Sequence, residues 1–353
     1  MLMPIQIKEK ELTRGDQDVE DITFADLRLV ETDVEEFLRK NIDVIFEEME
    51  TLLVVGQQVI NTGGGRTDLV ALDAAGSIVL IELKRDQKDI KARKEPLESQ
   101  AIRYAASLAK IRTPDELVDK IFENYIEKHK KEFDLGVLTA QEMGRRKLAE
   151  YLEENRAEKT FNQKQRIILI ASSFDDQTLS AVAWLIQNGL DIAVFQLTPK
   201  RVGSALFLDI QRILPPDRLD DFYQDVISRS SAPPRQSISG TRGRTSLPRM
   251  RTLMDWGILK HGDTLVIKGN EDQDSEAEVI DHRFVRFKNE EITYNDWGKK
   301  VTGWSSICIY EWAMVKGDTK TLAERRQEKI NDDLGKASDD QQRDGDDTPE
   351  QPV

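Results

Sequence analysis

The sequence predicts a mixed α/β domain followed by a small α+β domain. Apolar, β-rich runs alternate with helical patterns over roughly the first 225 residues. A stretch rich in arginine, proline and glycine interrupts this pattern at 228–248, and four of the five tryptophans follow it. At 353 residues the chain is long enough for two domains plus connecting segments.

Composition narrows the chemistry that the chain can carry. The single cysteine, Cys308, excludes an internal disulfide and a cysteine-based zinc site. His129, His261 and His282 are dispersed, so a metal would be held by carboxylates, which suits Mg²⁺ or Mn²⁺. Because no apolar run approaches about 18 residues and residues 1–10 lack an apolar segment, we expect a cytoplasmic protein without a membrane partner.

Charge is distributed unevenly along the chain. The net charge is −14, but the segment from Asn331 onward holds eight acids against two bases. We therefore predict an acidic, disordered tail at 327–353. Between Ser228 and Arg251 there are six arginines and no acid, which predicts a flexible basic linker at 228–248. Such a linker can hold a phosphate backbone without reading its sequence, although a solubilising hinge is an equal alternative.

The first domain is predicted to begin with a helix and a three-stranded meander. Thr32-Asp33-Val34-Glu35 matches a capping box, and apolar residues continue at helical spacing to Phe46. The strands are expected at Leu52 to Ile60, Thr67 to Leu72 and Ile78 to Lys84. The glycines at 63–65 lack the spacing of a phosphate-binding loop, so we expect a tight turn with close backbone approach.

A charged helical insertion and a strand–helix–strand unit complete this domain. The insertion is predicted at about 113–165. The strands are predicted at Arg166 to Ala171 and Ile192 to Leu197, with a helix at Leu179 to Asn188 between them. This order predicts a right-handed crossover between parallel strands.

The predicted hairpin brings together the residues that are best suited to catalysis. If Asp73 pairs with Ser77, the register places Asp68 opposite Glu82, where two carboxylates repel unless a divalent cation lies between them. Lys84 projects from the same face as Glu82. Carboxylates that hold a metal beside a lysine are suited to phosphodiester hydrolysis. The alternative is an exposed, charged strand edge.

Downstream, Gln100 and Tyr104 share one face of a predicted helix. Gln100 can bond an attacking water or a phosphate oxygen, and Tyr104 can stack on or position DNA. Taken alone, the spacing favours an ordinary helix surface with a core tyrosine.

These motifs together resemble the PD-(D/E)XK nuclease superfamily, in particular its RecB-like branch. The segments that carry the resemblance are Gly65 to Asp73, Ile78 to Arg85 and Gln100 to Tyr104, within about 29–109. The resemblance implies a restriction-endonuclease-like mixed sheet flanked by helices. Thr67 stands where the family usually has proline.

The resemblance also assigns roles to individual residues. It implies Asp68 and Glu82 as metal ligands and Lys84 as the catalytic lysine, with Gln100 and Tyr104 matching the family's helix motif. The family places a further acid on the first helix, and both Glu31 and Glu35 are candidates for that role. If Glu35 caps the helix, its carboxylate is not available to the site.

The second domain resembles a RAMA domain, a module associated with restriction systems and adenine methylases. The matching segments are Gly257 to Leu265, Gly303-Trp304, Tyr310 to Trp312 and Leu322 to Arg326. The resemblance implies recognition of DNA, including modified DNA. Exposed aromatic rings can stack on a base, but we expect at least two of the four tryptophans to fill a small core.

The resulting prediction is a metal-dependent DNA endonuclease of restriction or defence type. Its segments are an N-terminal stretch at 1–30, a nuclease-like domain at 31–227, a linker at 228–248, a RAMA-like domain at 249–326 and a tail at 327–353. Two rivals stay open: a non-catalytic DNA-binding protein, and an interaction protein that recruits a nuclease or methyltransferase. A homodimer and a restriction–modification partner are also open.

Overall fold

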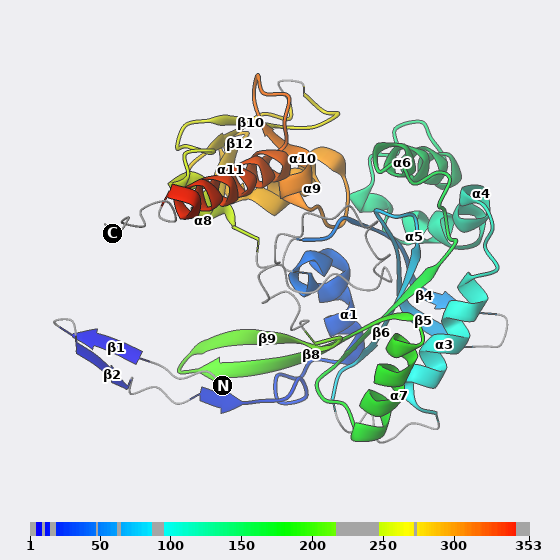
Figure 1. Ribbon diagram of the computed structural model, residues 1–353. Coiled ribbons are helices and arrows are strands. Elements are labelled where there is room, and N and C mark those ends of the chain that lie inside the picture. Colours follow the sequence, from blue (N-terminus) through cyan, green and yellow to red (C-terminus); the bar gives the residue numbers. More distant parts are fainter. Residues whose placement is uncertain are drawn as a thin grey trace, which may run out of the picture. The chain divides into compact units, whose positions relative to one another are not determined.

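The computed structural model describes residues 5–8, 11–14, 19–46, 49–61, 65–86, 95–216, 247–271 and 274–343. The chain forms two compact units (Figure 1). Unit 1 comprises Met1–Glu47 and Leu52–Thr245, and unit 2 comprises Glu48–Thr51 and Ser246–Val353. Most of the predicted linker at 228–248 lies outside the described residues.

Unit 1 is built on a seven-stranded mixed sheet. Its strands are β3 (Val19–Asp21), β4 (Leu52–Ile60), β5 (Arg66–Asp73), β6 (Ile78–Lys84), β7 (Gln165–Ala171), β8 (Asp191–Val202) and β9 (Ala205–Leu214). Along the sheet the order is β3-β8-β7-β6-β5-β4, and β9 pairs with β8. Strands β4, β5 and β6 form an antiparallel meander, whereas β6, β7 and β8 are parallel. A separate hairpin joins β1 (Ile5–Lys8) to β2 (Glu11–Arg14).

Helices cover both faces of this sheet. Helix α1 (Glu31–Lys40) lies on one face, and α3 (Leu97–Leu108) and α7 (Asp176–Gln187) lie on the other (Figure 1). The central strands are continuous apolar runs because both of their faces are buried. The predicted α/β class is therefore confirmed, as is the parallel crossover from β7 through α7 to β8.

The helical insertion packs against the edge strand β4. It consists of α4 (Pro114–Leu117), a π-helical turn η2 (Val118–Phe122), α5 (Glu123–Lys128), a short 3-10 turn η3 (Lys130–Glu132) and α6 (Ala140–Glu154). A Cβ atom at Gly56 would lie 2.6 Å from Cγ2 of Ile121, so glycine allows the close approach. The insertion thereby shields a sheet edge that would otherwise be open to pairing.

Several local predictions for unit 1 were wrong. Helix α1 begins at Glu31 rather than after Thr32, because Asp33 accepts a hydrogen bond from the backbone N–H of Val30 at 2.8 Å. It ends at Lys40 instead of continuing to Phe46, and a 3-10 turn, η1 (Ile42–Ile45), follows it. Strand β8 extends to Val202 instead of ending at Leu197, and it forms a hairpin with β9, which was not predicted. Seven of the ten residues of β9 are apolar, but none of the ten is fully buried and they do not alternate regularly with polar residues, so the sequence lacks the period-2 pattern of a half-buried strand.

Unit 2 contains a five-stranded antiparallel sheet in the order β13-β12-β11-β10-β14. Its strands are β10 (Thr264–Ile267), β11 (Ala277–Val279), β12 (Phe284–Phe287), β13 (Glu290–Thr293) and β14 (Ala313–Val315). Its helices are α8 (Met250–Asp255), α9 (Tyr294–Thr302), α10 (Ile309–Trp312) and α11 (Leu322–Arg343). Ser306 Oγ donates to the Glu50 carbonyl at 2.6 Å, which ties the short early segment into this unit.

Aromatic side chains form much of the core of unit 2. Trp297 is fully buried and donates from Nε1 to the Ser275 carbonyl at 2.8 Å, and Trp304 is also buried. Trp256 and Trp312 are partly exposed. The prediction that at least two tryptophans fill the core is confirmed.

Helix α11 continues to Arg343, whereas the segment from 327 onward was expected to be disordered. Residues 344–353 lie outside the described part of the chain. Among the described residues, no helix is long and apolar enough to cross a membrane.

Candidate active site

The β5–β6 hairpin has the predicted geometry. The backbone N–H of Asp73 donates to the Ser77 carbonyl at 3.1 Å, and Gly76 adopts a left-handed φ of 80° in the loop between them. The ladder runs to the pair Leu69 and Ile81, so Asp68 and Glu82 stand one step beyond the last pair. The two carboxylates therefore emerge side by side on one face of the sheet.

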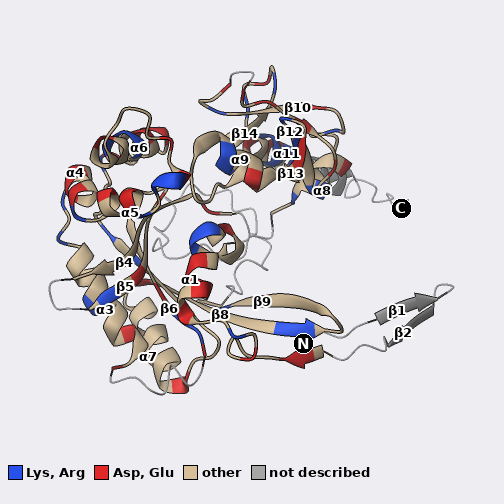
Figure 2. Ribbon diagram, turned by 180° about the vertical axis from the view of Figure 1, so that it is seen from behind, with Lys and Arg blue, Asp and Glu red and all other residues tan. Residues whose placement is uncertain are grey.

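Lys84 lies between these two carboxylates and a third from α1. Its Nζ atom is 3.7 Å from Glu82 Oε1, 3.9 Å from Asp68 Oδ2 and 2.8 Å from Glu31 Oε1. The convergence of Asp68, Glu82 and Lys84 expected from the register is thus present, and Glu31 joins it. Figure 2 shows acidic segments of α1, β5 and β6 where these elements approach one another.

Both strand carboxylates are buried and held in place by hydrogen bonds. Asp68 is 5% exposed and Glu82 is 0% exposed. The backbone N–H of Leu83 donates to Asp68 Oδ2 at 2.7 Å, and Gln100 Nε2 donates to Glu82 Oε1 at 2.8 Å. Because both donors come from rigid elements, the carboxylates have little freedom to turn away.

Helix α3 supplies the two residues of the predicted helix motif. Gln100 Nε2 also donates to Tyr104 Oη at 3.1 Å, so its amide supports Glu82 and Tyr104 rather than a water or phosphate. Tyr104 is buried, which leaves its ring no free face for the expected stacking on DNA. A Cβ atom at Gly65 would lie 2.5 Å from the Tyr104 ring, so the expected close approach occurs there, whereas residues 62–64 are outside the described chain.

Glu35 lies close enough to Asp68 for their charges to interact. Because Asp33 caps α1, Glu35 is free of the capping role considered for it. Its side chain is 1% exposed, Oε2 accepts a hydrogen bond from Gln58 Nε2, and Oε1 has no hydrogen-bond partner. The sequence did not single out Gln58, because its contact with Glu35 depends on how α1 packs against β4.

Burial and mutual repulsion shift the pKa values of the site. Burial, reinforced by the charge of Asp68, raises the pKa of Glu35 to about 7. Burial also raises the pKa of Asp68 to about 6, against the opposing effects of Lys84 and the Leu83 N–H. Burial alone would lower the pKa of Lys84, but the surrounding carboxylates outweigh it and raise that pKa. The site thus concentrates negative charge that a cation would stabilise.

The side chains present are of the chemical kind that a hard divalent cation prefers. Asp68, Glu82 and Glu35 provide only oxygen atoms, and Oε1 of Glu35 is buried without a hydrogen-bond partner. Within the described residues, no group of three or more acidic, histidine or cysteine side chains is already arranged to hold a metal. In this conformation, Lys84 supplies the balancing charge instead.

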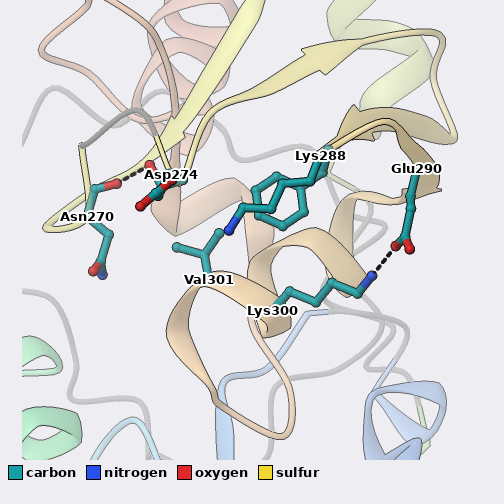
Figure 3. Close-up of a pocket in the computed structure, with 8 residues that line it drawn as sticks. Asn270, Asp274, Lys288, Glu290, Lys300 and Val301 are labelled. Carbon is teal, nitrogen blue, oxygen red and sulfur yellow. Dashed lines mark hydrogen bonds and ion pairs between the residues drawn. The ribbon is translucent and has the colours of Figure 1, made fainter.

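Unit 2 contains a separate polar pocket of about 480 Å³. Figure 3 shows Lys288 extending across it toward Val301, while Lys300 forms an ion pair with Glu290 at 2.5 Å. Asn270 and Asp274 line the opposite side. Its mixed charges suit a polar ligand that carries both donors and acceptors.

No family model, no curated protein and no solved structure matches this chain. The functional conclusion therefore depends on the chain's own residues and on their geometry. The relation to PD-(D/E)XK nucleases and RAMA domains likewise stays a proposal that is based on the motifs.

Proposed function

We propose that this protein is a metal-dependent DNA endonuclease of the PD-(D/E)XK type with a restriction or defence role. The observation that carries the proposal is the buried convergence of Asp68, Glu82 and Lys84 on one face of the sheet. The mixed sheet flanked by helices supports it, because the resemblance to PD-(D/E)XK nucleases implies a sheet of that kind.

In this proposal, each residue of the first unit has a distinct task. Asp68 and Glu82 would hold Mg²⁺ or Mn²⁺, which when bound polarises the phosphoryl oxygen and lowers the pKa of water. Lys84 orients the nucleophilic water and balances the charge that develops on the phosphate. Gln100 keeps Glu82 Oε1 in place, and Tyr104 Oη accepts a second hydrogen bond from the Gln100 amide.

The second unit would select the target DNA. The RAMA-like motifs support recognition of modified bases, and the polar pocket around Lys288 and Lys300 offers a place for a DNA group. The arginines between Ser228 and Arg251 would add backbone contacts that weaken as salt increases. A homodimer and a restriction–modification partner belong to the same proposal.

A non-catalytic DNA-binding protein is the second candidate. One observation favours it: Lys84 already neutralises the strand carboxylates, and the described residues hold no preassembled metal cluster. In that case the protein would retain DNA without cutting it.

The decisive experiment compares cleavage of unmodified and base-modified plasmid DNA in Mg²⁺, Mn²⁺ or EDTA. Glu82→Ala and Lys84→Ala should each lower the cleavage rate by at least about 100-fold without unfolding the protein. The exposed residues Glu127 and Lys131 provide matched controls, and their alanine variants should cut at the wild-type rate when DNA is saturating.

The outcomes separate the two candidates. Full cleavage by both Glu82→Ala and Lys84→Ala would refute the assignment of the site. If no substrate is cut under any condition but DNA is still retarded in a gel, the protein is a DNA-binding protein. Cleavage that requires both the metal and Glu82 would establish the endonuclease, and the comparison of substrates would show whether base modification matters.

A further inference from the structure

Strand β4 contains a bulge directly beside the site. Val54 pairs with Ala71 and Gly56 pairs with Val70, so Val55 is an extra residue on β4. Beyond the bulge, Gln57 pairs with Leu69 and Val59 pairs with Thr67. The bulge therefore brings Gln58 opposite Asp68, and without it Gln57 would occupy that position. A shift of one residue reverses which side chains of a strand face the site.

The backbone at Gln58 is unusual for a residue other than glycine. Its φ is 57°, in the left-handed region where a Cβ atom is unfavourable. The consequence is visible in the contacts: Gln57 Nε2 donates to Glu36 Oε2 at 3.3 Å, and Gln58 Nε2 donates to Glu35 Oε2. Consecutive residues of a regular strand point to opposite faces, yet these two reach adjacent residues of one helix.

The side chain that Gln58 contacts is incompletely satisfied. Glu35 is almost fully buried, and its Oε1 has no hydrogen-bond partner. A buried acceptor without a partner is costly, and so is a left-handed glutamine. Both unfavourable features occur within one contact, beside Asp68. Backbone strain of this kind is commonly found where it sets the geometry of a functional site.

We propose that the β4 bulge and Gln58 are a positioning device that holds Glu35 as the third carboxylate of the site. Gln58 occupies Oε2 of Glu35 and leaves Oε1 available for the divalent cation held by Asp68 and Glu82. Glycine would fit the backbone at this position better, but it has no amide to hold the carboxylate. This inference rests on the proposed metal-dependent function and identifies Gln58 as a positioning residue.

The test combines Gln58→Gly with the isosteric Gln58→Glu. Glycine relieves the backbone and removes the amide, whereas glutamate keeps the size and replaces the donor with an acceptor. Three quantities are measured on the full chain: Mn²⁺ affinity by calorimetry without DNA, kcat and KM for cleavage of DNA, and the melting temperature. Arg156→Gly is the matched control, because Arg156 also has a left-handed φ, of 55°, and is exposed.

The expected result is a loss of function without a loss of stability. Both Gln58 variants should weaken Mn²⁺ binding and lower kcat by about 10-fold or more, with KM for DNA unchanged. The melting temperature of Gln58→Gly should stay within roughly 4 °C of the wild type. Arg156→Gly should change neither Mn²⁺ affinity nor kcat. In a Glu35→Ala background, Gln58→Gly should change Mn²⁺ affinity and kcat by less than about 2-fold, because Gln58 acts only by holding Glu35.

Several results would overturn the inference. Wild-type Mn²⁺ affinity in both Gln58 variants would do so. So would a Gln58→Gly change that lowers Mn²⁺ affinity and kcat as much in the Glu35→Ala background as it does in the wild type. If wild-type protein cuts DNA and the Gln58 variants cut it equally well, the positioning role fails while the endonuclease stands. If the variants weaken Mn²⁺ binding but even wild-type protein cuts no DNA, the positioning role stands while the endonuclease fails. Absence of Mn²⁺ binding in the wild type would reject both.

Discussion

Arg39 connects α1 to the helical insertion, and its removal should have a measurable and pH-dependent cost. Its side chain is almost fully buried. The guanidinium donates to both carboxylate oxygens of Glu36 and of Glu132, and to Tyr125 Oη at 2.9 Å. Arg39→Met keeps an apolar stem of similar length and removes all of these hydrogen bonds. The insertion would then lose its main polar attachment to α1.

The magnitude follows from the pKa of Glu36. The hydrogen bond from Arg39 is the main reason that this pKa falls from 4.5 to about 2. A shift of that size corresponds to about 3 kcal/mol, but the Glu36 side chain is 37% exposed, so screening by water reduces it to roughly 1.5 kcal/mol. The loss of the bonds to Glu132, whose side chain is 45% exposed, and to the buried Tyr125 Oη adds about 1.5 kcal/mol. We therefore expect Arg39→Met to lower the free energy of unfolding by about 3 kcal/mol at pH 7.

The cost should shrink in acid. Because the pKa of Glu36 is lower in the folded protein, its contribution to stability is present above pH 4.5 and is lost as the pH falls toward 2. The variant lacks this contribution at every pH. The difference in unfolding free energy between wild type and variant should therefore decrease by about 1.5 kcal/mol between pH 7 and the acid limit.

Urea unfolding at pH 7, 4.5 and 3, followed by far-UV circular dichroism, measures this difference. Lys40→Met is the matched control, because Lys40 pairs with the same Glu36 at 3.1 Å but its side chain is 56% exposed. That variant should cost less than about 0.5 kcal/mol at pH 7. A difference for Arg39→Met that is the same at pH 3 as at pH 7 would refute the reasoning.

Two further predictions concern positions where α3 is held in place. Asn162 Nδ2 donates to the carbonyls of Leu108 and Ile111 at 3.0 and 2.8 Å, so Asn162→Ala should lower the free energy of unfolding by about 2 kcal/mol in urea titrations. A loss below about 0.5 kcal/mol would show that water replaces the amide. Gly65→Ala should displace the Tyr104 ring and lower kcat for DNA cleavage by about 10-fold or more while the circular dichroism spectrum is retained; wild-type cleavage would contradict it.

Much of the candidate site could be predicted from the sequence because it is local. The loop between Asp73 and Ser77 sets the register of two adjacent strands, and that register extends over only a few residues to Asp68 and Glu82. The side-chain alternation of a strand then places Lys84 beside Glu82. The contact between Gln100 and Tyr104 follows in the same way from one turn of helix.

The remaining features depend on contacts between elements that are far apart in sequence. Lys84 and Glu31 are separated by 53 positions, and only the packing of α1 on the sheet brings them to 2.8 Å. The helix pattern does not distinguish Glu31 from Glu35 as the acid of the site, because two residues that are four apart share one face. In the folded chain both approach the strand carboxylates, Glu31 through Lys84 and Glu35 through Asp68.

The sequence by itself thus determined the α/β class, the central strands and the hairpin that carries Asp68, Glu82 and Lys84. Their patterns are set by burial on both faces and by one short loop, and these are properties of neighbouring residues. Only the tertiary structure decided the position of Gln58, whose left-handed backbone and bulged register have no signature in composition. It also decided the pairing of β9 with β8, because β9 is apolar without regular alternation and none of its side chains is fully buried, so its place comes from its partner strand.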